Sequence, residues 1–278
     1  MDITLATRNL EQEAAQLIRH VTKGITSKYE GTWTLSVYDT AWISMVSLPN
    51  GDWLFPESFR FVLQQQQEDG SWPSYASESD GILNTLASLL AIEKHLEKET
   101  DALGATKLNI QQHKMRGLKR VQDALEQWSV KSCVHVGFEI LIPALLSLLS
   151  GYGVELHFPA ETALDIIYKE KMKKFSPEVL YGPHQSTLLH SLEAFAHTVD
   201  CSRLAHHKVG GSILGSPSAT AAYLMYVPDW DYEAENYLRR CIENGGGSGL
   251  GGVPSAYPCE IFEFTWVCPP LRLLTPDH

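Results

Sequence analysis

The chain has 278 residues, 44% of them apolar, and a formal net charge of −11. This length suits one large or two small domains with a substantial core. The acidic balance argues against nucleic acid or an anionic membrane as a partner, because both are negatively charged. No apolar run reaches the roughly 18 residues that a membrane-spanning helix needs.

The N-terminus and the cysteines favour a cytoplasmic protein with reduced thiols. Residues 1–4 do not form a basic region followed by an apolar one, so no secretory signal is expected. The five cysteines are odd in number and scattered, and no Cys-x-x-Cys pair occurs. A zinc site is therefore not expected.

Two helices are predicted in the first fifty residues. The first covers 10–21, with apolar side chains on one side. The second lies in 36–46, where Asp39 is expected to cap the helix or stand in its first turn. Tyr38 and Trp42 are four residues apart and share a face. Capping and an aromatic core contact are preferred here to a catalytic role.

A helical hairpin is predicted next, and the rest of the chain is organised around it. Its first helix begins near Pro56, a residue that suits the first turn. Gly70 is placed to stop this helix, and Trp72 follows as an anchor. Apolar residues over 82–96 then recur at three- and four-residue spacing, which predicts one apolar face of the second helix.

The middle of the chain is predicted to continue as helices. A polar surface connection over 97–109 leads to a helix over 110–127. The apolar run over 134–146 predicts a buried helix with Pro143 near its first turn. The basic run over 168–175 reads as a solvated helix end before Pro177.

A further helix is predicted over 187–195, with Leu188, Leu189, Leu192 and Phe195 inside. His190 lies at the boundary of this face, where a structural histidine is preferred to a catalytic one. His197 follows seven residues later, but no third ligand is evident, so no metal site is assigned.

The glycine-rich segment over 210–224 leads into a helix of small residues and reads as a degenerate second hairpin. A phosphate-binding loop is the alternative, but no Gly-Lys-Ser/Thr follows it. Asp229 and Asp231 resemble an acidic catalytic box and are interpreted instead as the cap of a helix over 234–241. A loop over 245–258 enters a last helix around 261–267.

Six segments, taken together, resemble the N-terminal part of fungal bifunctional diterpene synthases of the copalyl diphosphate synthase and ent-kaurene synthase type. The Gln-x-x-x-Gly-x-Trp pattern at 66–72 is similar to the QW motif of triterpene and diterpene cyclases. The resemblance covers roughly residues 10–268 and rests on Tyr-Asp-Thr-Ala-Trp, Gln-Glu-Asp-Gly-Ser-Trp, His-Val-Gly-Phe-Glu-Ile, Leu-Leu-His-Ser-Leu-Glu, Ser-Pro-Ser-Ala-Thr-Ala-Ala-Tyr-Leu and Gly-Gly-Val-Pro-Ser-Ala-Tyr-Pro.

The resemblance implies an all-α fold, an α/α toroid with a γ domain and an incomplete β domain. The implied boundaries are 1–55 for the first β-domain helices, 56–255 for the inserted γ domain and 256–278 for the start of the second β-domain half. The family reaction, an isomerisation, protonates geranylgeranyl diphosphate and closes two rings to give copalyl diphosphate.

The resemblance also implies site residues. His190 and Ser255 stand where plant relatives hold the water that takes the final proton, with Ser255 in place of an asparagine. We expect their polar atoms about 4–6 Å apart, bridged by one water. Lys174 matches a lysine that contacts the diphosphate. Relatives carry an acidic Mg²⁺-associated cluster, of which only Glu126 is acidic here.

One part of the family machinery is absent from the sequence. The acid of these enzymes is the middle Asp of Asp-x-Asp-Asp, and no such motif occurs. We therefore expect no cyclisation by this chain alone, some weak diphosphate binding, and an exposed apolar wall that lowers solubility. A complementary cyclase chain is a candidate partner. The alternative function is a helical scaffold or partner module without chemistry.

Overall fold

The computed structural model describes residues 34–259 apart from 73, 75–76, 99–106, 134 and 246–248, together with Glu13, Gln16 and Arg19. The chain divides into two units, one of Met1–Trp33 with Pro258–His278 and the other of Thr34–Tyr257. The helix expected over 10–21 falls largely outside the described residues, although the three described there are helical. The last helix, expected over 261–267, lies outside them altogether.

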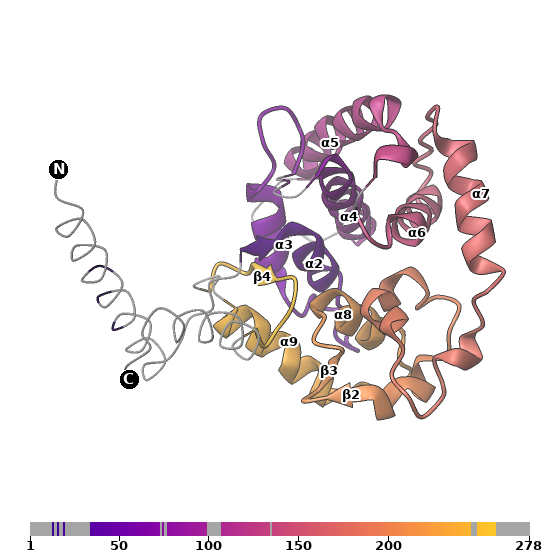
Figure 1. The fold of residues 1–278 in the computed structure, drawn as a ribbon. Coiled ribbons are helices and arrows are strands. Elements are labelled where there is room, and N and C mark those ends of the chain that lie inside the picture. Colours follow the sequence, from indigo (N-terminus) through magenta and orange to yellow (C-terminus); the bar gives the residue numbers. More distant parts are fainter. Residues whose placement is uncertain are drawn as a thin grey trace, which may run out of the picture. The chain divides into compact units, whose positions relative to one another are not determined.

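The second unit is built mainly of helices, in agreement with the predicted all-α class (Figure 1). It runs from Thr34 to Tyr257, and the domain boundaries at 56 and 255 stay a prediction. Its longer helices are α2 (Val37–Ser44), α3 (Pro56–Gln64), α4 (Glu78–Glu97), α5 (Lys107–Gln127), α6 (Phe138–Ser150), α7 (Glu161–Met172), α8 (Pro217–Tyr226) and α9 (Tyr232–Asn244).

Short 3₁₀ helices and two-residue strands complete the described part. The 3₁₀ helices are η2 (Val130–Ser132), η3 (Pro177–Val179), η4 (Thr187–Ala194) and η5 (Cys201–His207). The strands form two antiparallel pairs, β1 (Leu35–Ser36) with β4 (Val253–Pro254) and β2 (Lys208–Val209) with β3 (Ser212–Ile213). The sequence did not predict these strands, because two residues carry no alternation pattern.

The helix starts follow the capping residues of the sequence. Pro56 occupies the first turn of α3, as predicted. Ser77 accepts a hydrogen bond from the Asp80 amide at the start of α4. Asp231 caps α9 by accepting from the Glu233 and Ala234 amides, which confirms the interpretation of the acidic box as a cap.

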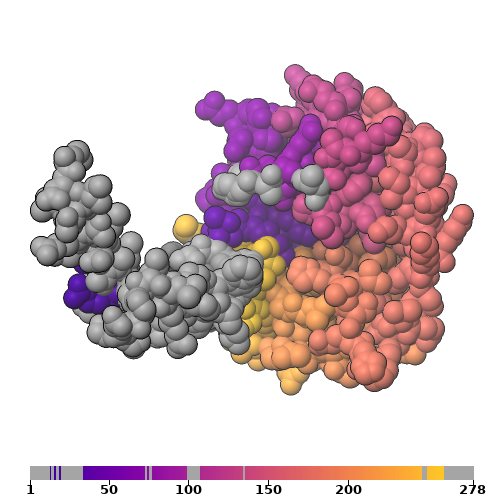
Figure 2. Space-filling view, in the orientation of Figure 1, coloured from indigo at the N-terminus to yellow at the C-terminus, as the bar shows by residue number. Residues whose placement is uncertain are grey.

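Helix α4 lies at the centre of one half of the unit, packed against α2, α5 and α6 (Figure 1). Its buried residues are not confined to one face, contrary to the prediction, because helices cover it on several sides. They include Asn84 and Ser88 besides Leu86 and Leu89. In the space-filling view the purple and magenta segments form this half, and the orange segments after α7 form the other (Figure 2).

The hairpin around Trp72 is confirmed, with one correction. Trp72 is buried and its Nε1 donates to the Val62 carbonyl, 2.7 Å away. Gln66 donates to the His113 carbonyl of α5. Helix α3 ends at Gln64, so Gly70 does not stop it. Gly70 has φ +90° and packs so closely on α5 that a Cβ would lie 2.5 Å from a backbone oxygen.

Two other helical predictions need correction. Pro143 lies inside α6 rather than in its first turn, and α6 is only partly buried because one side of it lines a cleft. The segment predicted as a helix over 187–195 is the 3₁₀ helix η4, which is kinked at Ser191 (φ −118°, ψ 37°). Trp42 is buried, as predicted.

Candidate active site

The structure brings the two predicted proton-acceptor residues, His190 and Ser255, to one cleft. This cleft, called the polar cleft below, has a volume of about 230 Å³. It collects side chains from α2, α4, η4, α8 and the segment after β4. Its lining is Ser36, Tyr38, Asp39, Asp80, Leu83, His135, Val136, Leu141, His190, Ser191, Glu193, Ser218 and Ser255.

The polar cleft has an exposed mouth and a buried floor. His190 and Ser255 are exposed, whereas Asp39, Glu193 and Ser218 are buried. The exposure of His190 agrees with its predicted place at the boundary of the apolar face. His190 projects from η4, a short 3₁₀ helix whose other side is held in the core by Leu189 and other apolar residues.

Ser255 is positioned by the tightly packed segment before it. Gly251 has φ +92°, and a Cβ there would meet the Glu57 carbonyl group at 2.5 Å. The Ser58 hydroxyl donates to the Gly251 carbonyl at 2.8 Å. Val253 then pairs with Ser36 in the β1–β4 ladder. The Gly-Gly-Val-Pro motif thus fixes the chain against α2 and α3 just before Ser255.

Asp39 joins two helix starts at the floor of the cleft. Its Oδ2 accepts from the Ser36 hydroxyl (2.6 Å) and its Oδ1 from the Ser218 amide of α8 (3.1 Å). Of the two predicted alternatives, the first-turn position of Asp39 is confirmed, because Ser36 is the N-cap of α2. In addition, Asp39 accepts from an amide in the first turn of α8. Burial raises the pKa of Asp39, while the hydrogen bonds from Ser36 and Ser218 and the charge of His190 oppose that shift.

Glu193 is a site residue that the sequence prediction missed. Its Oε1 accepts from the Tyr38 hydroxyl (3.0 Å) and from the Ser218 hydroxyl (3.3 Å), and its Oε2 is buried without a hydrogen-bond partner. Burial raises its pKa to about 8, and the nearby Asp39 adds to the shift. The available signal was an acid among apolar residues, three positions after His190.

A second, larger cleft adjoins the first. This apolar cleft, of about 600 Å³, is formed by the start of α6, the end of α7 and η4. It shares Val136, His190 and Ser191 with the polar cleft. Its lining is Val136, Gly137, Glu139, Ile140, Lys171, Met172, Lys174, Phe175, Thr187, Leu188, His190, Ser191 and Phe195. The rings of Phe175 and Phe195 stack with centroids 4.5 Å apart.

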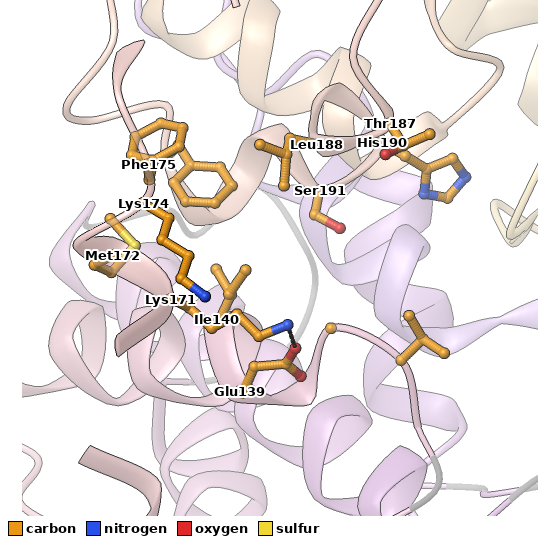
Figure 3. Close-up of a pocket in the computed structure, with 13 residues that line it drawn as sticks. Glu139, Ile140, Lys171, Met172, Lys174, Phe175, Thr187, Leu188, His190 and Ser191 are labelled. Atoms are coloured by element: carbon orange, nitrogen blue, oxygen red, sulfur yellow. Dashed lines mark ion pairs between the residues drawn. The ribbon is translucent and has the colours of Figure 1, made fainter. Parts of the chain in front are cut away.

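Two lysines line the apolar cleft at the end of α7. Lys171 forms an ion pair with Glu139 at 3.0 Å, and Lys174 forms none within the part of the chain that the structure describes. In Figure 3, Lys174 lies on the opposite side of the cleft from His190. The apolar cleft thus has Lys174 and Phe175 on one side and His190 on the other.

Comparisons with known proteins show similarity to curated fungal diterpene synthases over most of this chain. The chain is 46% identical over 275 residues to phyllocladan-16-alpha-ol synthase of Phomopsis amygdali, covering 96% of this chain and 27% of that protein. It is 42% identical over 266 residues to copalyl diphosphate synthase of Talaromyces verruculosus, covering 94% of this chain and 28% of that protein. The chain is homologous to the N-terminal part of fungal diterpene cyclases.

The fold of this chain also matches that of a solved structure. Ent-copalyl diphosphate synthase from Arabidopsis thaliana, in complex with (S)-15-aza-14,15-dihydrogeranylgeranyl thiolodiphosphate, aligns with a TM-score of 0.75 and 26% identity. The alignment covers 93% of this chain and 35% of that chain. No family model matches the sequence. The chain spans about a quarter of the length of the curated relatives it matches.

The magnesium site that the cyclase family implies is not supported by the residues present. Glu126 is exposed at the end of α5, where its carboxylate accepts from the Gln122 amide. It does not line either cleft. Within the described ranges, no group of three or more His, Cys, Asp or Glu side chains could hold a metal ion. One carboxylate does not fit Mg²⁺, which is usually bound through carboxylates and substrate phosphates together.

Proposed function

We propose that this chain supplies one wall of a class II diterpene cyclase site, which binds geranylgeranyl diphosphate for protonation-initiated ring closure to copalyl diphosphate. The observation that carries the proposal is the pair of adjoining clefts that share His190. Homology to the diterpene cyclases and the ligand of the plant structural neighbour support the choice of an isoprenoid diphosphate.

The apolar cleft suits the hydrocarbon chain of such a substrate. Much of its lining is apolar, and the faces of Phe175 and Phe195 can stabilise a positive charge by their quadrupoles. Lys174 has no ion-pair partner in the described part of the chain and would bind the diphosphate as a point charge. Lys171 can add to this if it leaves Glu139.

The polar cleft suits the final deprotonation. A water held between His190 and Ser255 would take the last proton and pass it to the His190 imidazole. A serine hydroxyl can hold this water through one donor and two acceptor sites. Ser255 thereby takes the place that the resemblance gives to an asparagine amide.

The initiating acid must come from outside this sequence, which contains no Asp-x-Asp-Asp motif. It would be supplied by the remainder of a longer protein or by a complementary cyclase chain. The carboxyl of Asp231 is unsuited to the role, because it caps α9 and because Lys208 lowers its pKa against the effect of burial.

The cell compartment belongs to the same proposal. Cys133, Cys201 and Cys241 are free thiols, which suits the cytosol. Among the described residues, no helix combines the length and the apolar character required to cross a bilayer.

Substrate binding by the purified chain tests the proposal. Binding of geranylgeranyl diphosphate is measured by calorimetry for the wild type, Lys174→Ala and the matched control Lys173→Ala, whose side chain is exposed and does not line the cleft. Loss of one charge-assisted contact should weaken binding by about tenfold in Lys174→Ala alone. Equal effects of both variants would contradict the role of Lys174.

Product analysis of the same mixtures, after phosphatase treatment, addresses the missing acid. We expect no copalyl diphosphate from the chain alone and turnover only when a segment with Asp-x-Asp-Asp is added. Product from the chain alone would show that it contains its own acid. Absence of any geranylgeranyl diphosphate binding would favour the helical scaffold without chemistry.

A further inference from the structure

The floor of the polar cleft contains a buried acid whose hydrogen bonds are incomplete. Glu193 is 3% exposed and lines the cleft. Its Oε1 already accepts two hydrogen bonds, from Tyr38 and Ser218, whereas its Oε2 is buried and has no partner. Buried polar atoms in folded proteins are nearly always paired with protein groups or with ordered water.

The charge state of Glu193 decides what its free oxygen can offer. Burial raises the pKa of Glu193 to about 8, so the group is mainly neutral at pH 7. Because Oε1 accepts from two hydroxyls, the proton of the neutral acid belongs on Oε2. The free oxygen is then an O–H donor that has no acceptor among the described groups.

The polar cleft has room and partners for water at this point. Its volume of about 230 Å³ exceeds the roughly 30 Å³ that one water occupies in the liquid. Ordered buried waters make about three hydrogen bonds to polar groups, and the cleft supplies hydroxyl, imidazole and carboxyl groups. His190 and Ser255 at its mouth are the exposed end of the same space.

We propose that Oε2 of Glu193 donates a hydrogen bond to an ordered water at the floor of the polar cleft, and that this water connects the buried cluster to His190 and Ser255. Glu193 is then a positioning residue for the water that takes the final proton. The water site stands on the geometry of the cleft alone, and only its part in deprotonation rests on the proposed function.

Several titratable groups surround Glu193 and set its response to pH. Asp39 and Tyr38 face it from α2, His190 from its own helix, and Asp80 and His135 line the same cleft. Ionisation of Glu193 would place a second negative charge beside Asp39. It would also turn Oε2 from a donor into an acceptor, so the water would have to reorient.

Crystallography of the 278-residue chain at neutral pH tests the water site directly. We expect a water within about 3 Å of Oε2, present in wild type, in Glu193→Gln and in the control Tyr38→Phe, which alters only the Oε1 side. Glu193→Leu, similar in volume but without polar atoms, should lose it. A dry floor in the wild type, or a side chain bonded to Oε2, would overturn the proposal.

The pH dependence of stability tests the protonation state. The folded pKa of Glu193 lies above its ordinary value of 4.5, so folding takes up a proton between about pH 4.5 and 8. The stabilisation is therefore full below pH 4.5 and lost as the pH rises through about 8. Relative to Glu193→Gln, which cannot ionise, the urea midpoint of the wild type should fall over this range. A constant difference would show that Glu193 is not the neutral donor.

The proposed water link between Glu193 and His190 is tested by a measurement that would not change if Glu193 had only a structural role. The ring signals of His190, assigned by their loss in His190→Gln, are followed by NMR from pH 5 to 9. We expect an inflection near pH 8 in the wild type that is absent in Glu193→Gln. If the wild type shows no inflection near pH 8, the proposed link between Glu193 and His190 is wrong. These experiments test the water site alone. The geranylgeranyl diphosphate assays test the proposed function, so either proposal can fail without the other.

Discussion

Helices α2 and α8 begin with the same local arrangement, although they are far apart in the sequence. Ser36 and Ser216 are the N-caps, and a threonine stands four residues after each. The Thr40 hydroxyl donates to the Ser36 carbonyl at 2.6 Å, and the Thr220 hydroxyl donates to the Ser216 carbonyl at 2.7 Å. Both threonines are fully buried.

Each threonine also ties its helix to a two-residue strand. Thr40 accepts from the Val253 amide of β4 at 3.1 Å, and Thr220 accepts from the Ile213 amide of β3 at 2.9 Å. A short strand with few ladder hydrogen bonds gains a fixed partner in this way. The two helix starts are thus held by equivalent contacts.

The difference lies at the third position after the cap. Helix α2 has Asp39 there, and α8 has Ala219. Since Asp39 also accepts from the Ser218 amide, one carboxylate serves the N-termini of both helices. Helix N-termini carry partial positive charge, so a shared acid between two of them is favoured. The negative charge of Asp39 at this junction also favours the neutral form of the neighbouring Glu193.

The largest effect in this comparison is expected for Asp39→Ala. The change leaves the buried Ser218 amide and the Ser36 hydroxyl without their acceptor, which we expect to lower the free energy of unfolding by about 2–4 kcal/mol. Urea denaturation measures it. Asp39→Asn, which keeps an acceptor oxygen, should lose clearly less. Equal losses would mean that charge, rather than the shared hydrogen bond, holds the two helices.

Matched threonine variants test the equivalence itself. Thr40→Val and Thr220→Val keep the shape of the side chain and remove the hydroxyl that accepts a strand amide. We expect each to lower the free energy of unfolding by about 1–2 kcal/mol, because a buried donor is left unpaired. Values that differ by much more than about 0.5 kcal/mol would show that the two starts are alike in geometry only.

The smallest effects are expected at the caps. Ser36→Ala and Ser216→Ala each remove an acceptor for a helix amide, a loss of about 1 kcal/mol. The Ser36 hydroxyl also donates to the Asp39 carboxyl at 2.6 Å, whereas the second hydrogen bond of Ser216, to the Ser218 hydroxyl, is longer at 3.1 Å, so the loss at Ser36 should be the larger. Thermal unfolding of the two variants side by side measures the order. A larger loss at Ser216 would show that the cap of α8 contributes more to stability than the cap of α2.

The parts of the fold that depend on neighbouring residues could be predicted from the sequence. Pro56 marks a helix start, Asp231 acts as a cap, and the apolar spacing before Leu96 gives a long helix, because each effect is complete within a few residues of chain. The inside position of Pro143 could not be read in the same way. It depends on which side of α6 faces a cleft, and therefore on helices elsewhere in the chain.

The candidate site shows the same division. The motifs identified His190 and Ser255, and the structure places both at one cleft. Glu193 is buried because it packs against Tyr38 of α2 and Ser218 of α8. The kink of η4 at Ser191 likewise has no signal in the local sequence. Sequence rules treat an acid such as Glu193 as exposed. Its burial depends on Tyr38, which lies 155 positions earlier.

The pairing of β1 with β4 joins the two ends of the described unit. Leu35 lies opposite Pro254, so the chain enters and leaves this unit at the same place. A module whose entry and exit are adjacent can be inserted into a host chain, or removed from it, with little disturbance of the host backbone. The β1–β4 ladder therefore gives residues 34–257 the adjacent ends that allow a domain to be inserted into a longer chain or exchanged between chains.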